Sequence, residues 1–394
     1  MLKRLAIIST HPIQYNAPLF ALLEVRGNIK IKVFYTWGEE VLQKKYDPGF
    51  GKTIEWDIPL LKGYEYTFVK NIASKKGSHH FMGIDNPTLI KEVKDWEANA
   101  VLVYGWCFKS HLKVLRYFNG KIPVMFRGDS VSLNEVPIYK KWMRQLFLKW
   151  VYKNVDVALY VGTHNKAYYC ENGLKEKQLF FVPHAIDNNR FRKTVEGSSD
   201  AIAEWKKNIG INDEAIVFLY AGKLDENKNV GMVAEAFIQL QDKNQHLIIA
   251  GNGITEAALK KQYEHHMHIH FFPFQNQSQM PILYGMADVY VLASHSETWG
   301  LALNEAMACG KALLVSAACG AAIDLVQDGI NGWIFKSNDR NDLLEKMEWM
   351  GAGKNRLKEM GVQSASIINE WSYEKGSEKI EALVINQLLA ANNY

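Results

Sequence analysis

The chain has only four cysteines among its 394 residues, and they lie far apart. Their spacing matches no zinc site, and scattered cysteines are typical of reduced proteins of the cytoplasm. No run reaches the roughly eighteen apolar residues of a membrane span, and the apolar segment after Met1 is too short for a signal peptide. We therefore expect a cytoplasmic protein without a resident metal. The cysteines are Cys107, Cys170, Cys309 and Cys319.

The chain also lacks the last glycine of a dinucleotide-binding fingerprint. Gly251 and Gly253 follow an apolar strand pattern, but Glu256 stands where that fingerprint needs its third glycine. This absence disfavours an oxidoreductase that binds a nicotinamide dinucleotide.

Acidic residues are scarce in the first half of the chain. Residues 1–190 hold 28 lysines and arginines against 17 acidic residues, a net charge of +11, whereas residues 191–394 carry −7. With 48% hydrophobic and 22% charged residues the chain is globular, and its length suggests two or three domains. The split indicates two domains with different partners, the basic one facing an acidic acceptor or a membrane surface. A split without function is the alternative, and nothing indicates a nucleic-acid partner.

Strand patterns alternate with helix patterns along both halves, which predicts an α/β fold with parallel sheets covered by helices. The interval from Trp37 to Gly63 fits neither period and is expected to be a long loop or a small excursion. The expected strands are 4–10, 30–35, 66–69, 100–104, 123–126 and 157–161, then 215–221, 246–250, 269–272, 289–293 and 312–316. The expected helices include 17–24, 87–96, 109–118, 137–152, 165–172 and 373–389.

The most informative segment contains Glu297 and Glu305, with seven residues between them. An apolar run over 289–293 precedes it and predicts a buried parallel strand. Gly300 then opens a helix, so Glu297 lies on the loop after the strand and Glu305 two turns into the helix. Ligands of open α/β sheets bind outside the carboxyl ends of strands, and the free amides of a helix N-terminus favour anions. Two surface glutamates around a core helix are the simpler alternative.

This spacing resembles the family-four retaining glycosyltransferases of the GT-B fold, and the resemblance continues to Gly332. It implies that Glu297 faces the donor sugar and that Glu305 holds the ribose hydroxyls of the nucleotide. The residues that open the helix, Thr298, Trp299, Gly300 and Leu301, are expected to bind the donor.

The resemblance also implies the architecture: two Rossmann-like domains that face a central cleft. Residues 1–190 are expected to bind the acceptor, residues 191–372 the nucleotide sugar, and residues 373–394 to form a helix that packs back on the first domain. The segment 180–191, in which Asp187 precedes Phe191, resembles the interdomain segment of the family.

Several further residues of the second half are similar to donor-binding positions of the family. Lys223 and Lys228 bracket a turn before a helix, and such a pair of cations can hold a diphosphate as point charges. The family has arginine where Lys223 stands, and two solvated lysines are the alternative. The remaining expected donor contacts are Gly251 and Gly253, where the donor approaches the main chain, Phe274 at the nucleobase, and Gly320 at another helix start.

The first half resembles the family only in outline. His11 and Gln14 follow the first strand, where they either meet the ligand or form a plain turn. Arg127 and Asp129 stand at the end of a later strand, where the family often has a histidine, and we expect them in the catalytic site rather than in a salt bridge. His79 and the other histidines have no partner at metal-ligand spacing.

The function implied by the resemblance is retaining transfer of a hexosyl or N-acetylhexosaminyl group. The donor is expected to be a UDP-linked sugar, which is a substrate rather than a cofactor. The acceptor is expected to be a glycan or a lipid-linked molecule. A sugar-nucleotide-binding protein without catalysis and a sugar-nucleotide epimerase of the same fold remain alternatives.

Residues 139–154 combine an apolar face with five basic residues. Two interpretations remain open. The one we favour is a helix docked on the sheet of its own domain, as every βα unit requires. The other is an interfacial helix that contacts an anionic membrane, which would place the protein on the inner membrane face.

Overall fold

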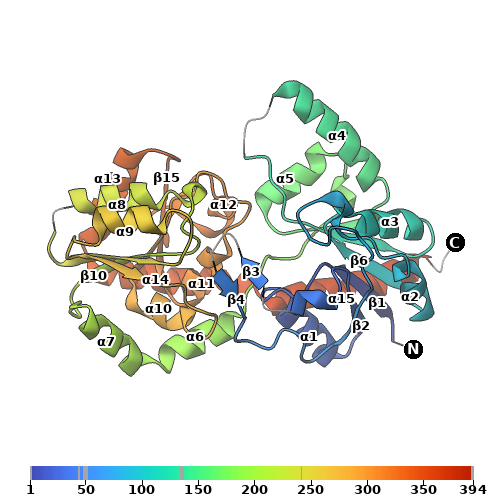
Figure 1. Cartoon of the computed structure of the whole chain (residues 1–394), viewed down its shortest axis with the longest axis horizontal. Helices are drawn as coiled ribbons and strands as arrows, with labels where there is room; N and C mark the ends of the chain where they lie inside the picture. Colours follow the sequence, from blue (N-terminus) through green and yellow to red (C-terminus); the bar gives the residue numbers. More distant parts are fainter. Residues whose placement is uncertain (1, 43–44, 48–51, 134–136, 241, 392–394) are drawn as a thin grey trace. The chain divides into compact units, whose positions relative to one another are not determined.

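The computed structural model describes residues 2–42, 45–47, 52–133, 137–240 and 242–391 (Figure 1). The chain forms two compact units. The first contains Met1–Lys44, Pro59–His184 and Tyr373–Tyr394, and the second contains Lys45–Ile58 and Ala185–Ser372.

The first unit is built on one sheet of seven strands with the order β5-β2-β1-β6-β7-β8-β9, and every neighbouring pair is parallel. Its apolar strands are buried because helices cover both faces of such a sheet. The strands are β1 Arg4–Ser9, β2 Lys30–Tyr35, β5 Glu65–Phe68, β6 Ala100–Tyr104, β7 Val124–Arg127, β8 Val157–Tyr160 and β9 Leu179–Phe181. The helices are α1 Ala17–Arg26, α2 Leu89–Asp95, α3 Lys109–Phe118, α4 Ile138–Tyr152, α5 Thr163–Glu171 and α15 Tyr373–Ala391, with short 3-10 turns η1 Glu39–Leu42, η2 Phe81–Gly83 and η3 Glu176–Gln178.

The second unit has a parallel sheet of six strands with the order β12-β11-β10-β13-β14-β15. The strands are β10 Ile216–Ala221, β11 Gln245–Ala250, β12 Ile269–Phe272, β13 Val289–Leu292, β14 Ala312–Ser316 and β15 Gly332–Phe335, and the pair β3 Lys45–Asp47 and β4 Lys52–Ile54 is antiparallel. The helices are α6 Asn188–Glu196, α7 Ser199–Asn208, α8 Val230–Gln239, α9 Glu256–Tyr263, α10 Met280–Met286, α11 Leu301–Ala308, α12 Ala322–Leu325, α13 Arg340–Gly351 and α14 Lys354–Ile367, with turns η4 Glu226–Lys228 and η5 Ile368–Glu370.

The last helix, α15, packs against α1 in the first unit. Glu381 anchors it, because its buried carboxylate accepts hydrogen bonds from Arg26 Nε at 2.9 Å and from Asn28 Nδ2 at 2.9 Å. A buried charge is tolerated only when it is paired in this way. The end of the chain is therefore part of the first unit although it follows the second in sequence.

The helix α4 differs from the docked helix that the sequence favoured. Only Leu148, Val151 and Tyr152 are buried, and the preceding two turns expose large apolar side chains. The prediction that its apolar face packs on the sheet is therefore wrong for most of the helix. Within the described residues, no helix is both long and apolar enough to cross a membrane.

Candidate functional site

A lysine–glutamate ion pair joins the loops that follow β10 and β13. Lys228, at the end of η4, places its Nζ against the carboxylate of Glu297, and each side chain is 19% exposed. Two hydrogen bonds of 2.8 Å hold the loops together: His295 N donates to the Asn227 oxygen, and Asn227 Nδ2 donates to the Ser296 oxygen. Two of the predicted site charges are thus in contact at the carboxyl ends of neighbouring strands.

This pair has a consequence for anion binding. Lys228 and Glu297 neutralise each other, and both are partly shielded from water, so their mutual attraction is stronger than that of an exposed pair. A phosphate that approaches the ammonium of Lys228 must compete with the Glu297 carboxylate. Binding of a diphosphate here would therefore release Glu297 for another partner.

Main-chain hydrogen bonds join the Glu297 loop to the turn after β14. Glu297 N donates to the Ala318 oxygen at 3.1 Å, and Gly320 N donates back to the Glu297 oxygen at 2.9 Å. A Cβ at Gly320 would lie 2.0 Å from the Thr298 oxygen, so only glycine fits. The amide of Gly320, which we expected to face a ligand, is instead used within the protein. Its role is to fix the position of Glu297.

Gly300 provides the turn that starts α11. Its φ of +95° is a left-handed conformation that disfavours other residues, and a Cβ there would lie 3.0 Å from Cys319 Sγ. The helix begins at Leu301, so its N-terminal amides lie next to the loop that carries Glu297. Thr298 is exposed and Leu301 is partly buried, which leaves both at the rim of this helix start.

Trp299, one of the residues that precede α11, has a buried side chain. It is 3% exposed, and its Nε1 donates to Asn304 Oδ1 at 2.9 Å. Its main-chain oxygen accepts a hydrogen bond from Cys319 Sγ at 3.0 Å. The indole therefore ties the loop to the first turn of α11, and the expected donor contact of this residue stays a prediction for its main chain.

Glu305 lies on the buried side of α11 and is 3% exposed. The Tyr284 hydroxyl, from α10, donates to Glu305 Oε2 at 2.9 Å. Burial, followed by the nearby charges of Glu305 and Glu297, raises the pKa of Tyr290 well above its usual value. The two glutamates are therefore close enough to act on one neutral tyrosine. Tyr284 orients Glu305, and the motif spacing alone gave no sign of it.

The cation Lys223 stands five positions before Lys228 on the loop after β10 and is partly buried. Tyr220 Oη donates to the Lys223 oxygen at 2.5 Å, which fixes the main chain of the turn. Burial raises the pKa of Tyr220 well above its usual value, so this donor stays protonated at neutral pH. The turn is therefore rigid where the two lysines leave it.

The glycines after β11 serve close packing between loops. A Cβ at Gly251 would lie 1.8 Å from the Gly222 oxygen, and one at Gly253 would lie 2.2 Å from the Leu224 oxygen. Leu224 N donates to the Asn252 oxygen at 2.9 Å, so the loops after β10 and β11 are bonded where they touch. The structure thus explains both glycines without the donor approach that we predicted for them.

Phe274 lies beside residues 55–57, a segment that comes from the first half of the sequence. Its amide donates to Asn252 Oδ1 at 2.8 Å, and its ring lies 6.4 Å from the ring of Trp56. Asn276 Nδ2 donates to the Glu55 oxygen at 2.6 Å, and Ser278 N donates to Asp57 Oδ2 at 3.1 Å. The sequence gave no sign that residues 55–57 would join the second unit beside the segment expected to meet a nucleobase.

In the first unit, His11 and Gln14 follow β1 and both are partly buried. His11 Nδ1 lies 2.8 Å from Thr10 Oγ1, and its ring makes an edge contact with Trp37 at 5.3 Å. The position at the carboxyl end of β1 is the predicted one. These contacts agree equally with a ligand-facing histidine and with a plain turn.

Arg127 is a correction. It is buried, and its guanidinium donates to the Val182 and Pro183 oxygens, both at 2.9 Å. It holds the segment that leaves the first unit, and we remove it from the catalytic residues. Asp129, two positions on, is exposed. The same segment places His184 near Arg127, and burial, assisted by that charge, lowers the pKa of His184 to about 3.

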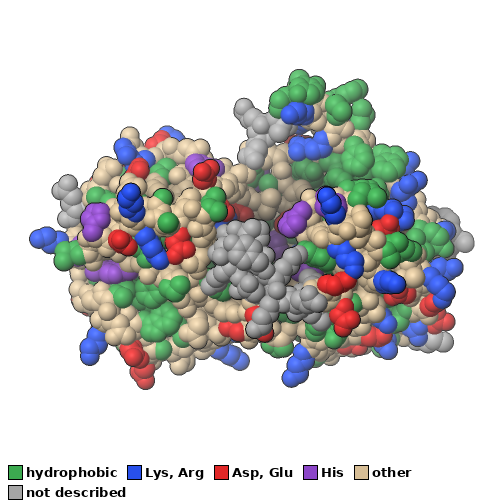
Figure 2. Space-filling model, viewed as in Figure 1, with side chains coloured by type: hydrophobic (Ala, Val, Ile, Leu, Met, Phe, Trp, Pro, Cys, Tyr) green, Lys and Arg blue, Asp and Glu red, His purple; other side chains and the backbone are tan. Residues whose placement is uncertain are grey.

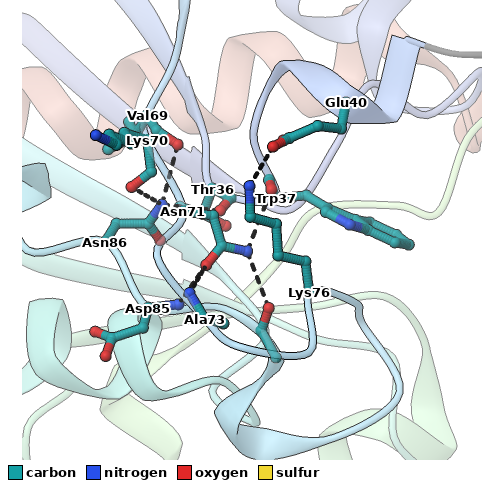
Figure 3. Close-up of polar contacts among 11 residues, drawn as sticks. Thr36, Trp37, Glu40, Val69, Lys70, Asn71, Ala73, Lys76, Asp85 and Asn86 are labelled. Carbon is teal, nitrogen blue, oxygen red and sulfur yellow. Dashed lines mark hydrogen bonds and ion pairs between the residues drawn. The ribbon is translucent and has the colours of Figure 1, made fainter.

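Two buried asparagines, Asn71 and Asn86, fix the loop after β5 (Figure 3). Asn71 Nδ2 donates to the Trp37 and Gly83 oxygens at 3.2 and 2.9 Å, and Asn71 Oδ1 accepts from Ala73 N and Asp85 N, both at 3.0 Å. The network borders a hollow of about 640 Å³ that the Glu40–Lys76 ion pair also lines.

We predict that Asn71→Ala lowers the free energy of unfolding by about 2 kcal/mol, because buried main-chain groups lose their partners. Urea denaturation measures this. Asn71→Asp keeps both acceptor bonds but turns a buried carboxylate oxygen toward the Trp37 and Gly83 oxygens, so it should lower the free energy of unfolding at least as much as Asn71→Ala. A change below about 0.5 kcal/mol for Asn71→Ala would contradict the role given to Asn71.

His111 makes the first unit sensitive to acid. It is fully buried between Thr36 Oγ1 at 2.8 Å and the Tyr104 and Gly105 oxygens at 3.0 Å. Burial lowers its pKa to about 4, against hydrogen bonds that raise it. Between pH 6.5 and 4, His111 is therefore protonated in the unfolded chain but remains neutral in the folded state.

We accordingly expect stability to fall as the pH drops through this window, by up to about 1.4 kcal/mol per pH unit for this residue. Denaturant unfolding at several pH values measures the slope, and His111→Gln should reduce it. An unchanged slope in His111→Gln would contradict a neutral buried imidazole.

Among the described residues, no group of three or more His, Cys, Asp or Glu side chains is arranged to hold a metal ion. Residues 201–365 match the family model of the glycosyl transferases group 1. This segment is similar to the glycosyltransferases of that family. It contains Lys223, Lys228, Glu297 and Glu305, so all four predicted charges of the second unit fall within the matched family.

The curated relatives match only part of the chain. The D-inositol 3-phosphate glycosyltransferase of Geodermatophilus obscurus is 28% identical over 205 residues, which are 47% of this chain and 44% of that protein. The first four curated relatives are matched over 35% to 52% of their own length, so the chain spans about half of them or less.

Solved structures match over nearly the whole chain. A glycosyltransferase from Rickettsia africae ESF-5 has a TM-score of 0.73 at 13% identity, covering 98% of this chain and 99% of that one. HepE of Anabaena, solved with UDP, has a TM-score of 0.71 at 14% identity, covering 98% and 100%. The predicted α/β fold with two Rossmann-like parallel sheets and GT-B glycosyltransferases as structural neighbours is confirmed.

Proposed function

We propose that this protein transfers a hexosyl or N-acetylhexosaminyl group from a nucleotide sugar, with UDP as the nucleotide, to a glycan or lipid-linked acceptor. One observation carries the proposal. The glutamates Glu297 and Glu305 bracket the N-terminus of α11, and the lysine Lys228 is already bound to the first of them. This places a cation, two carboxylates and a helix N-terminus in the segment that is similar to the group 1 glycosyltransferases.

Each group has a role that suits its surroundings. Glu305, oriented by the Tyr284 hydroxyl, accepts hydrogen bonds from ribose hydroxyls. Lys228, Lys223 and the first amides of α11 stabilise the diphosphate. When phosphate takes the ammonium of Lys228, Glu297 is released to orient the donor sugar. The ion pair thus couples arrival of the diphosphate to placement of the sugar.

The reaction we propose retains the anomeric configuration. The bond from the anomeric carbon to the phosphate oxygen breaks, and the acceptor hydroxyl attacks from the same face through a sugar cation-like state. The hydroxyl proton passes to the leaving phosphate, so no side-chain base is required. Stabilising the growing charge of the diphosphate is the main task of the protein.

UDP is the first nucleotide to test, since HepE of Anabaena, which shares the fold, was solved with UDP. A thermal-shift screen of the full chain against UDP, GDP, ADP, their common sugar conjugates and NAD identifies the donor. A ligand at a hundred times its dissociation constant adds roughly 2.7 kcal/mol of stability. A shift with UDP and a UDP-sugar supports the proposal, whereas a shift with NAD alone overturns it.

Binding alone does not separate a transferase from a sugar-nucleotide-binding protein. Release of UDP from the stabilising UDP-sugar, followed with a coupled assay, makes that distinction. Slow release in water that increases with acceptor supports transfer. Tight binding of the UDP-sugar without any release contradicts it and favours a binding protein.

A further inference from the structure

The helix α4 presents an apolar surface that its own unit does not cover. Ile138, Trp142 and Leu146 are 85%, 62% and 50% exposed, and their spacing of four residues places them on one face. Figure 2 shows the side chains of this helix as an apolar patch with lysines and arginines beside it. The exposed large apolar residues of α4 are Ile138, Tyr139, Trp142, Met143, Leu146, Phe147 and Trp150.

This concentration is specific to α4. Of the twenty large hydrophobic side chains that are exposed within the described part of the chain, seven lie on this helix and the others are scattered over many elements. Single exposed apolar residues need no explanation, but a contiguous group marks a surface that contacts something else. The patch continues onto Trp106, whose ring lies 5.3 Å from that of Phe147.

The charges of the helix are all of one sign. Residues 137–153 hold five basic residues and no acidic one. Lys140, Lys149 and Lys153 are exposed, and Arg116 of α3 stacks over Trp150 at 5.3 Å. Long basic side chains can lay their stems along an apolar surface and keep their charge in the headgroup region. The cationic groups therefore border the apolar face without interrupting it.

This chemistry favours one occupant over the others. Interfaces between proteins are depleted in lysine, whereas residues 137–153 carry four. Tryptophan and tyrosine, both present on the exposed face, are the residues that concentrate at the boundary between lipid and water. We propose that α4 lies flat in the surface of an anionic bilayer, with Ile138, Trp142 and Leu146 inserted among the lipids. The inference stands on the exposed side chains and charges and does not depend on the proposed reaction.

Sedimentation of the full chain with vesicles tests this proposal. We expect binding to vesicles of equal phosphatidylglycerol and phosphatidylcholine, little binding to phosphatidylcholine alone, and loss of binding in about 1 M salt, where charges are screened within about 3 Å. Ile138→Gln, Trp142→Gln and Leu146→Gln together should lower the partition coefficient on the order of 1000-fold, since each insertion contributes about tenfold or more.

A control for the apolar substitutions, and a set of charge substitutions with its own control, make the result specific. Met267→Gln, Ile330→Gln and Val362→Gln remove three exposed apolar residues of the second unit and should leave the partition coefficient within about twofold. Lys140→Gln, Lys141→Gln and Arg144→Gln should lower it on the order of 100-fold, at about fivefold per charge. Lys207→Gln, Lys243→Gln and Lys261→Gln, also exposed, are their control.

The altered side chains are exposed, so the variants should fold with unchanged melting temperature. Absence of binding to anionic vesicles by the parent chain overturns the proposal. So does binding by the triple Gln variant of α4 that equals the parent. A parent that self-associates in sedimentation velocity, ignores vesicles and becomes monomeric in the α4 variant would identify the face as an interface between copies instead.

Discussion

Glu297→Gln is expected to lower kcat for sugar transfer about 1000-fold while the Kd for UDP changes less than threefold. The carboxylate is proposed to act on the donor sugar, which UDP lacks, so nucleotide binding loses nothing. A 1000-fold loss corresponds to about 4 kcal/mol, the scale of removing one preorganised charge from a transition state. Steady-state kinetics and calorimetry on the same samples measure the two quantities.

The ion pair with Lys228 sharpens this prediction. Glu297→Gln removes the competitor for the Lys228 ammonium, so UDP should bind as well as before or slightly better. Glu345→Gln is the matched control, because it removes an exposed glutamate of α13 that is paired with Lys346. Its kcat should stay within twofold of the parent. A Glu297→Gln enzyme with parental kcat would remove this residue from the reaction.

Glu305→Ala is expected to raise the Kd for UDP about 100-fold. The loss of a charged acceptor of two ribose hydrogen bonds is worth roughly 2.7 kcal/mol. The parent carboxylate is buried and oriented by Tyr284, so it is ready to bind without rearrangement. Titration calorimetry with UDP gives the constant, and titration with uracil, which has no ribose, gives a baseline that should not respond.

Two milder variants separate a binding role from a structural one. Glu305→Gln keeps the size of the side chain and one acceptor, so its Kd should lie between those of the parent and Glu305→Ala. Tyr284→Phe removes only the orienting hydroxyl, and we expect about a fivefold weaker affinity for UDP with a small change in melting temperature. Parental affinity for UDP in a folded Glu305→Ala variant would show that the ribose lies elsewhere.

Much of the fold could be predicted because buried parallel strands are continuous apolar runs. β2, β6, β12 and β14 begin and end where the sequence pattern predicted. β9 and β15 were not among the expected strands. The start of β15 is set by Gly332, where a Cβ would lie 2.2 Å from the Leu313 oxygen, a contact that exists only after folding.

The candidate site likewise combines residues that the local sequence identifies with residues whose contacts form only on folding. Glu297, Glu305, Lys223 and Lys228 could be selected because the motifs that carry the family resemblance are local in the sequence. Arg127 was assigned wrongly because its acceptors, the Val182 and Pro183 oxygens, are more than fifty positions away. Tyr284 was missed for the same reason, since its bond to Glu305 joins two helices. Distant partners of this kind are fixed by packing rather than by local pattern.

The exposed face of α4 illustrates a further limit. Its sequence has the period of a docked helix, and the period alone cannot tell whether a sheet or another surface covers the apolar side. Only the burial of Leu148, Val151 and Tyr152, beside the exposure of Trp142, separates the two interpretations. The pattern identified the helix, and the structure decided which of its residues the fold uses.

Proton NMR shows directly whether the protein cleaves a nucleotide sugar for transfer. The parent chain and Glu297→Gln are each followed with UDP-glucose and UDP-N-acetylglucosamine, with and without a panel of glycan acceptors. We predict UDP and a product with the donor's anomeric configuration from the parent, and almost none from Glu297→Gln. Equal UDP release by both proteins, or a product of inverted configuration, would contradict the account.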